Sequence, residues 1–306
     1  MAARGGAQGF KRATGAAAAA SARGKRGGPR TKSLQPQNVS GMDMLAGPHA
    51  VAAALLSGSR WEARTLFLQN DLDAHFPQAN LDEVLAIGRE KYPKLRVRRV
   101  DKRSLDTRGG MHHRGAVLEC APLRLDRTEH DARTWDIAGG AQSRLLVLDQ
   151  VQDPQNLGAI LRSSYFLGVD HVALTKSNSA PPTPAVSRVS CGALELLAAE
   201  KRLHVIKGST AEFIAGLNER GWATFATHLG QDAQGPEVLT RRGCAALVLG
   251  NEETGVREHV VNACTGNVAI SKGRAAIAPS RAASQVDSLN VSASAAILLH
   301  FLSQRS

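Results

Sequence analysis

Residues 149–176 read DQVQDPQNLGAILRSSYFLGVDHVALTK, and this stretch decides the predicted fold. The apolar strand RLLVLD leads into it, a helix is predicted over 161–167, and a second apolar strand, HVALTK, closes it. A strand, a glycine-containing turn and a helix in this order are typical of a nucleotide-binding loop. However, neither of the glycine-rich motifs G-x-G-x-x-G and G-x-x-x-x-G-K-[ST] is present. Asn156, Gly158 and Arg162 at this turn therefore indicate a different ligand.

The same alternation of strands and helices continues to the end of the chain, over residues 143–306. The apolar segments HVIKG, ATFATHL, AALVLGNE and NVAIS alternate with helical segments, including one at 191–199, before the apolar helix NVSASAAILLHFLSQ. This pattern predicts a parallel α/β sheet. Ligands of such sheets bind beyond the carboxyl ends of the strands. Three polar segments follow strands in this way: QDPQNLGAILR, LGNEETG and QVDSLNVSAS.

Residues 45–125 predict a smaller α/β domain that precedes this sheet. A helix is expected at 48–56 and a strand at 65–69, followed by the amphipathic helix LDEVLAIGREKYP, the β-rich LRVRRV and the strand GAVLECAPL. Residues 126–142 are polar and lack periodicity, so they are interpreted as a linker between the two domains.

The first 42 residues carry most of the net charge of the chain. They contain eight basic residues and no acidic one, which is +8 of a formal net charge of +11. An Arg-rich, acid-free leader of this kind fits an organelle transit peptide or a disordered basic arm that binds nucleic acid. It contains no uninterrupted apolar run long enough for a secretory signal or a membrane anchor.

The four cysteines lie far apart, without a C-x-x-C pair or a histidine at metal-ligand spacing (Cys120, Cys191, Cys244 and Cys264). Neither a zinc site nor a disulfide framework is predicted, and a reducing compartment is expected. No pattern around Cys191 supports a nucleophile, so we interpret it as a small core residue.

Each of the three polar segments has an ordinary structural explanation when it is considered alone. Arg162 offers a planar donor fork for phosphate oxygens, but it also fits the exposed face of a helix. Gly250 and Glu252 suit a ligand that approaches the backbone, and equally an acidic loop after a strand. Ser288 and Asn290 precede an apolar helix, where N-terminal capping is a sufficient role.

Taken together, the three segments resemble a known family. NLGAILRSS, LVLGNEETG and DSLNVSAS, in this order at the strand ends of one α/β domain, look like the signature motifs of SPOUT-superfamily (SpoU/TrmH-type) RNA ribose 2′-O-methyltransferases. The resemblance covers 144–306 and, more weakly, 45–125. It implies a deep trefoil knot at the C-terminal end of the sheet, an exception to the rule that chains do not thread themselves. It also implies a homodimer whose site lies at a knot-to-knot interface.

The resemblance also assigns catalytic roles. Arg162 is implied to contact the phosphate of the target nucleotide and to help deprotonate its 2′-hydroxyl, while Asn156 holds the surrounding loop. Because the pKa of arginine exceeds about 12, orientation and charge stabilisation remain an alternative role for Arg162. Glu252, Ser288 and Asn290 are implied to complete the catalytic set.

S-adenosylmethionine is the implied cofactor, and no metal is required. The residues assigned to it by the resemblance are Thr227, Leu229, Gly230, Gly250, Ile270 and Leu289. The segment KGRAAIAPSRAASQV, which lies between NVAIS and DSLNVS, is longer and more basic than the linker common in bacterial relatives. Ile277 is therefore an alternative to Ile270 as the cofactor contact. Lys272, Arg274 and Arg281 are interpreted either as RNA phosphate contacts or as part of a neutral insertion.

The smaller domain resembles the ribosomal-protein-like RNA-binding domain that this family appends, with GPHAVAAAL matching its G-x-H-A-V opening. His49 is interpreted as a helix-start residue or as an RNA contact. His112 and His113 lie where the family commonly has His-Gln-Gly, and Arg114 replaces the glutamine. The loop around them is therefore expected to lie near RNA at most.

The predicted function is the S-adenosylmethionine-dependent 2′-O-methylation of a guanosine ribose in large-subunit rRNA. The basic leader and the likeness to mitochondrial members predict the mitochondrion, with a plastid or a bacterial cytoplasm as alternatives. Two alternatives are a tRNA ribose 2′-O-methyltransferase and a non-catalytic ribosome assembly factor on the same fold. A tRNA enzyme usually has helical extensions in place of a domain such as 45–125, so these residues favour rRNA as the substrate. A non-catalytic ribosome assembly factor is expected to have lost Arg162, Gly250 or Asn290, and all three are present.

Overall fold

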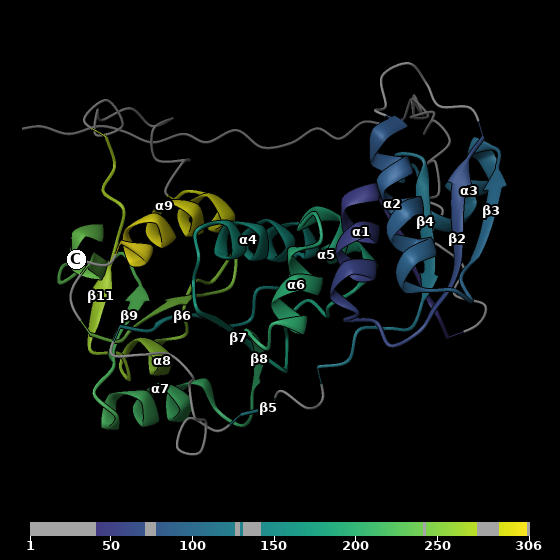
Figure 1. Ribbon diagram of the computed structural model, residues 1–306. Helices are drawn as coiled ribbons and strands as arrows, with labels where there is room; N and C mark the ends of the chain where they lie inside the picture. Colours follow the sequence, from purple (N-terminus) through teal and green to yellow (C-terminus); the bar gives the residue numbers. More distant parts are fainter. Residues whose placement is uncertain are drawn as a thin grey trace, which may run out of the picture. The chain divides into compact units, whose positions relative to one another are not determined.

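The computed structural model describes residues 41–70, 78–125, 129–130, 142–240, 243–273 and 288–304. Its elements form two sheets, a four-stranded sheet within residues 43–120 and a seven-stranded sheet within residues 129–268 (Figure 1). The predictions for the leader before residue 41, and for Ile277, Arg274 and Arg281, fall outside the described residues.

The smaller sheet has the strand order β1-β4-β2-β3. Its elements are β1 (Asp43–Ala46), α1 (Pro48–Ser57), β2 (Ala63–Gln69), α2 (Gln78–Lys91), β3 (Arg96–Val100), α3 (Lys102–Gly109) and β4 (Ala116–Cys120). Apolar side chains of α1 and α2 pack on one face of this sheet, and Leu105 of α3 packs on the other. Strand β1 is too short, and α3 too polar, to have been expected from hydrophobic periodicity.

The larger sheet has the order β11-β9-β10-β6-β7-β8-β5, and all of its strand pairs are parallel, as predicted. Its first half comprises β5 (Glu129–His130), β6 (Arg144–Leu148), α4 (Pro154–Phe166), β7 (His171–Thr175), α5 (Pro184–Val189), α6 (Ala193–Ala199) and β8 (Leu203–Ile206). The second half comprises α7 (Thr210–Glu219), β9 (Ala223–Thr227), η2 (Pro236–Thr240), β10 (Ala245–Leu249), α8 (Glu258–Val261), β11 (Gly266–Val268) and α9 (Val291–Ser303).

Helices cover both faces of the larger sheet (Figure 1). Alternate residues of a strand point to opposite faces, so Leu146 and Leu148 of β6 join the core beneath α4, α6 and α9. Leu145 and Val147 join the core beneath α7 and α8. This burial on both faces explains why the strands are apolar throughout, and each fully buried Leu or Val contributes about 1.5–3 kcal/mol.

Three predicted boundaries differ from the structure. Helix α4 begins at Pro154, earlier than expected, because Asp153 caps it through Gln155 N–H and proline fits the first helical position. The helix expected at 191–199 begins at Ala193. It is separated from α5 by Cys191 (φ 52°) and Gly192 (φ 88°), which are both left-handed. Within the expected linker, β5 adds a two-residue edge strand to the larger sheet.

A buried arginine joins the smaller sheet and its helices to the helices of the larger sheet. Arg60, 2% exposed, follows α1 and donates to Asp43 at 2.5 Å within its own domain. Across the junction it donates to the carboxylate of Glu195 on α6 at 3.0 Å and to the hydroxyl of Ser187 on α5 at 3.1 Å. At Gly192 an added Cβ would lie 2.3 Å from the Cβ of Ala53 on α1, so the backbones approach closely there. The elements of the smaller sheet therefore pack closely against α5 and α6 of the larger one.

Candidate functional site

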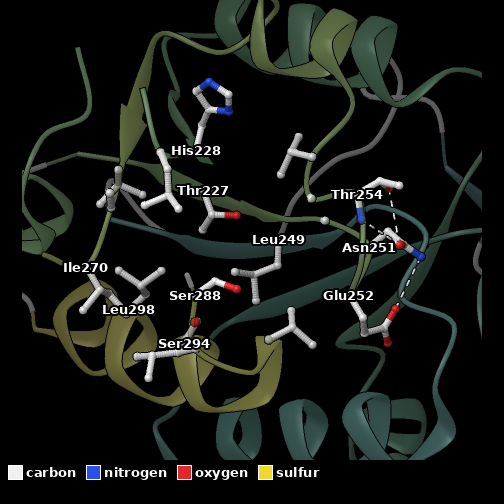
Figure 2. Close-up of a pocket in the computed structure, with 18 of the residues that line it drawn as sticks. Thr227, His228, Leu249, Asn251, Glu252, Thr254, Ile270, Ser288, Ser294 and Leu298 are labelled. Carbon is white, nitrogen blue, oxygen red and sulfur yellow. Dashed lines mark hydrogen bonds between the residues drawn. The ribbon is translucent and has the colours of Figure 1, made fainter. Parts of the chain in front are cut away.

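A cavity of about 710 Å³ lies at the carboxyl edge of the larger sheet. The segments that follow β9, β10 and β11 line it, together with the N-terminal part of α9. Figure 2 shows Thr227 and Leu249 on the strands, Ile270 after β11, and Ser294 and Leu298 projecting from α9. The volume is in the range of small-molecule sites, and its walls combine apolar side chains with backbone polar groups.

Gly250 forms part of the wall where β10 ends. A Cβ at this position would lie 2.1 Å from the carbonyl carbon of Gly255 and 2.2 Å from Val256 N. The loop folds back because Asn251 and Gly255 exchange two backbone hydrogen bonds of 3.0 Å each. Only a glycine permits this close approach, so a residue without a side chain is required at position 250.

The side chain of Asn251 stabilises the inside of this loop. Its carbonyl oxygen accepts from the N–H groups of Glu253 at 3.0 Å and Thr254 at 3.2 Å, and its amide donates to the carbonyl of Gln150 at 3.1 Å. Figure 2 shows Asn251 between Thr254 and Glu252. Asn251 was not among the predicted site residues, although an asparagine after a strand-ending glycine is a typical signal for such a turn.

A chain of polar side chains brings the three predicted segments together. The amide of Asn290, the N-cap of α9, donates to the side-chain oxygen of Asn156 at 3.1 Å. Asn156 in the first turn of α4 donates to the carboxylate of Glu252 at 3.3 Å. These contacts join residues that are 134 and 96 positions apart in the sequence.

Glu252 also accepts from the backbone N–H groups of Gln152, at 3.2 Å, and Asp153, at 3.0 Å. Partial burial acts to raise the pKa of the Glu252 carboxyl, but these hydrogen bonds to the ionised form outweigh it, and the pKa lies below its ordinary value. Glu252 is therefore an ionised acceptor that connects the loop after β10 to the segment before α4.

A second carboxylate holds the far end of the cavity loop. Asp149, fully buried at the end of β6, accepts from Arg257 in two hydrogen bonds of 2.6 and 2.9 Å. The hydroxyl of Thr210 donates to the same carboxylate at 2.9 Å. Because Val256 lines the cavity, this paired geometry fixes the loop on the side opposite Glu252. No separate pattern in the sequence predicted this ion pair.

The predicted cofactor residues lie around the same cavity, with one exception. Thr227, Leu229, Gly250, Ile270 and Leu289 all line it, and so does Ser288 from the predicted catalytic set. Gly230 is not among the lining residues, although it follows Leu229 directly. Of the other predicted catalytic residues, Glu252 lines the cavity, whereas Asn156 and Asn290 lie behind it in the polar chain.

Arg162 is placed differently from the other predicted residues. It lies on α4, six residues beyond Asn156, with its side chain exposed. It is not among the residues that line the cavity. Within the described part of the chain its guanidinium makes no hydrogen bond or ion pair, so its donors are available to a molecule that approaches α4.

Across the described residues, no helix combines the length and apolar character needed to cross a membrane. Within the same residues, no three His, Cys, Asp or Glu side chains are grouped so that they could bind a metal ion.

Comparisons with known proteins identify similar sequences and folds. The profile of the SpoU rRNA Methylase family matches residues 143–300. The chain is 34% identical over 283 residues to the human protein named rRNA methyltransferase 1, mitochondrial, covering 86% of this chain and 73% of that protein. It is 35% identical over 207 residues to the 23S rRNA (guanosine-2′-O-)-methyltransferase RlmB of Xylella fastidiosa, covering 67% and 76%.

The fold is similar to that of a solved structure in this group. The SpoU methyltransferase AviRb from Streptomyces viridochromogenes, in complex with AdoMet, superimposes with a TM-score of 0.60. The match covers 86% of this chain and 90% of that one at 19% sequence identity, so it is evidence for the fold alone.

Proposed function

Because this chain belongs to the SpoU rRNA methylase family, we infer that it is an S-adenosylmethionine-dependent RNA methyltransferase that modifies a ribose 2′-hydroxyl of rRNA. The observation that carries this inference is the joining of its three motif segments, through Asn290, Asn156 and Glu252, beside one cavity. The names of relatives, among them a 23S rRNA guanosine-2′-O-methyltransferase, support a guanosine of large-subunit rRNA as the target.

The cavity fits S-adenosylmethionine, which supplies an electrophilic methyl group when it is bound. Residues 249–256 line the cavity and bring apolar and polar groups to one wall, as an adenine ring and an amino-acid moiety require. We propose that Thr227, Leu229, Gly250, Ile270 and Leu289 contact it, and that Gly230, which follows Leu229, borders the site. Apolar walls contributed by Leu249 and Leu298 help to exclude water from this site.

The chain's own residues then have two tasks, orientation of the ribose and stabilisation of charge. Methyl transfer requires in-line approach of the 2′-oxygen, so positioning of the two substrates accounts for much of the rate. We propose that the exposed guanidinium of Arg162 binds a phosphate of the target nucleotide and stabilises the oxygen as it loses its proton. Asn156, Glu252, Ser288 and Asn290 hold the segments that surround it.

Arg162 does not line the cavity of its own subunit. This position supports an active site that a second copy of the chain completes. We propose a homodimer, with the C-terminal segments of each subunit folded as a trefoil knot. Exposed apolar side chains on and next to the neighbouring helices α4 and α9 fit such an interface: Phe166 is 86% exposed, Leu289 49% and Ile297 38%. Exposed apolar surface of this kind is typical of protein–protein contacts.

We propose further that residues 45–125 form the domain that binds the rRNA substrate and that the protein acts in the mitochondrion. The names of mitochondrial relatives from three eukaryotes support that compartment, although bacterial relatives also occur. The basic leader, in the part of the chain that the structure does not describe, has the composition of a transit peptide.

Transfer of a labelled methyl group from S-adenosylmethionine to large-subunit rRNA, mapped by primer extension, tests this function. The wild-type protein is expected to mark one ribose, and Arg162→Ala to lower kcat by about a hundredfold or more while S-adenosylmethionine binding is unchanged. Arg220→Ala, which removes an exposed arginine from the end of α7, serves as the matched control. Tight rRNA binding without any label, on naked rRNA and on immature subunits, would contradict the proposal and favour an assembly factor.

A further inference from the structure

The positive charge of the N-terminal domain is concentrated in one short segment. Residues 89–103, with the sequence REKYPKLRVRRVDKR, contain eight Lys or Arg residues and two acidic residues. The remaining described residues of 41–125 contain five Lys or Arg and six Asp or Glu. The segment comprises the end of α2, all of β3 and the start of α3, and all eight of its basic side chains are exposed.

Strand β3 presents arginines on both faces of the sheet. It lies at the edge of the sheet and pairs in parallel with β2. Arg98 is in register with Phe67, which packs against Leu105 of α3, so Arg96 and Arg98 lie on the α3 side and Arg99 on the opposite side. At about 3.3 Å per residue, the Cα atoms of the three arginines lie within roughly 10 Å along one strand.

These three arginines are not used within the fold. Among the described residues, Arg96, Arg98 and Arg99 make no hydrogen bond or ion pair. By contrast, Arg60 and Arg257 of the same chain are each paired with a carboxylate. An unpaired guanidinium keeps its planar donor fork free for a bidentate contact with a phosphate.

Protection of the sheet edge is a simpler explanation for charges on β3, because basic side chains on an edge strand prevent pairing with other chains. That role is commonly filled by a few charges, especially Lys, on the strand itself. It does not require the exposed cations of the neighbouring helix ends, Arg89, Lys91, Lys102 and Arg103. Basic residues extend beyond the strand, and all the basic residues within the strand are arginines and not lysines. Both features favour a polyanionic partner.

We propose that this basic edge, residues 89–103, binds phosphates of the substrate rRNA at a distance from the ribose that is methylated. The proposal rests on the proposed function, which supplies RNA as the partner. Figure 1 shows β3 on the far side of the N-terminal domain from β9 and β11, which lead into the cavity. An RNA that contacts both regions must reach from the edge of the smaller sheet to the carboxyl edge of the larger one, so a long rRNA segment is expected to bind more tightly than a short oligonucleotide.

The contacts between the domains make this division of labour possible. Arg60 and Gly192 lie in a closely packed junction, so the basic edge is held at a defined place relative to the cavity. RNA bound at the edge is thereby directed toward one ribose. Phosphate contacts position a nucleic acid without reading its sequence, and this is the role assigned to β3.

The test compares a triple variant, Arg96→Gln with Arg98→Gln and Arg99→Gln, with a matched triple, Lys201→Gln with Lys207→Gln and Arg220→Gln. The control residues are exposed on the larger domain. Filter binding measures the affinity for a full-length large-subunit rRNA transcript over a series of salt concentrations. The slope of log affinity against log salt is negative, and for the β3 variant its magnitude is expected to decrease by about two to three. The affinity of this variant at low salt is expected to fall by roughly tenfold or more. The control is expected to match the wild type.

Unchanged slope and affinity in the β3 variant would overturn the proposal. Methyl transfer measured in the same samples separates this failure from failure of the proposed function. If the wild type transfers no methyl group but the slopes differ, the RNA surface stands and the enzymatic function fails. If the β3 variant transfers methyl groups with the wild-type KM and binds rRNA with the wild-type salt dependence, the proposed RNA-binding role of residues 89–103 is wrong. The proposed enzymatic function then stands. S-adenosylmethionine binding by calorimetry, expected to be equal in all three proteins, verifies that each is folded.

Discussion

At the scale of single residues, Glu252 is the centre of the site. Its carboxylate accepts from two backbone N–H groups before α4 and from the amide of Asn156, which in turn accepts from Asn290. The three motifs are thus connected by one ionised group and two amides. Amides can donate and accept at once, so asparagine at 156 completes the chain in a way that neither an acid nor an apolar residue would.

The lowered pKa of Glu252 gives a pH-dependent prediction. A carboxyl whose folded-state pKa is depressed stabilises the fold above its unfolded pKa, and this stabilisation is lost as the pH falls through the folded value. Glu252→Gln is therefore expected to lower Tm at neutral pH, with a difference from wild type that shrinks below the ordinary pKa of 4.5. Scanning calorimetry across acidic pH measures it. Glu253→Gln, at an exposed neighbour, is the control, and a Tm difference independent of pH would contradict the assignment.

At the scale of elements, the site depends on how strands end. Strands β9, β10 and β11 are parallel neighbours, so the loops that follow them meet at one edge of the sheet. The loop after β10 is the tightest, because Gly250 lies against the backbone of Gly255 and Val256. The position of α9 across the cavity is fixed by its packing beside α4 and its cap at Asn290.

Gly250→Ala is expected to open this loop, because its Cβ would lie 2.1 Å from the carbonyl carbon of Gly255. The affinity for S-adenosylmethionine, measured by calorimetry, is expected to fall by about tenfold or more, the equivalent of one lost charged hydrogen bond. Gly273→Ala is the matched control, since a Cβ at this other cavity-lining glycine would meet nothing within 4 Å. Equal affinities in the two variants would show that the close approach at Gly250 is unimportant for binding.

At the scale of the whole molecule, the domain junction is polar at its centre. Burial raises the pKa of Glu195 above its ordinary value even though Arg60 is its partner, so desolvation dominates there. A buried ion pair of this kind contributes less to stability than its short distances suggest, and it is costly to break. Its role is better described as fixing the relative position of two domains.

Arg60→Met is expected to lower the free energy of unfolding by about 3–5 kcal/mol, because it leaves the carboxylate of Glu195 buried without its cationic partner, although the hydroxyl of Ser187 still donates to it at 2.6 Å. Adding Glu195→Gln to that variant removes the unpaired charge and is expected to restore part of the loss. Urea denaturation measures both, and hydrogen exchange is expected to show reduced protection in α1 and α6. If the single and double variants are equally stable, Arg60 and Glu195 are not energetically coupled.

Much of this protein was determined by local sequence. Apolar strands alternating with helices predicted the parallel sheet, and the polar segments after those strands predicted where a ligand binds, because parallel strands end at a common edge. Local pattern missed β1, α3 and the start of α4, since short or polar elements lack a hydrophobic period.

Tertiary structure alone decided the contacts on which the site depends. The link from Asn156 to Glu252, the pairing of Asp149 with Arg257, and the burial of Arg60 between two domains join residues far apart in the chain. Tertiary structure also placed Arg162 outside the cavity that its motif accompanies. Periodicity and capping act over a few neighbouring residues, whereas these contacts arise only when whole elements pack against one another.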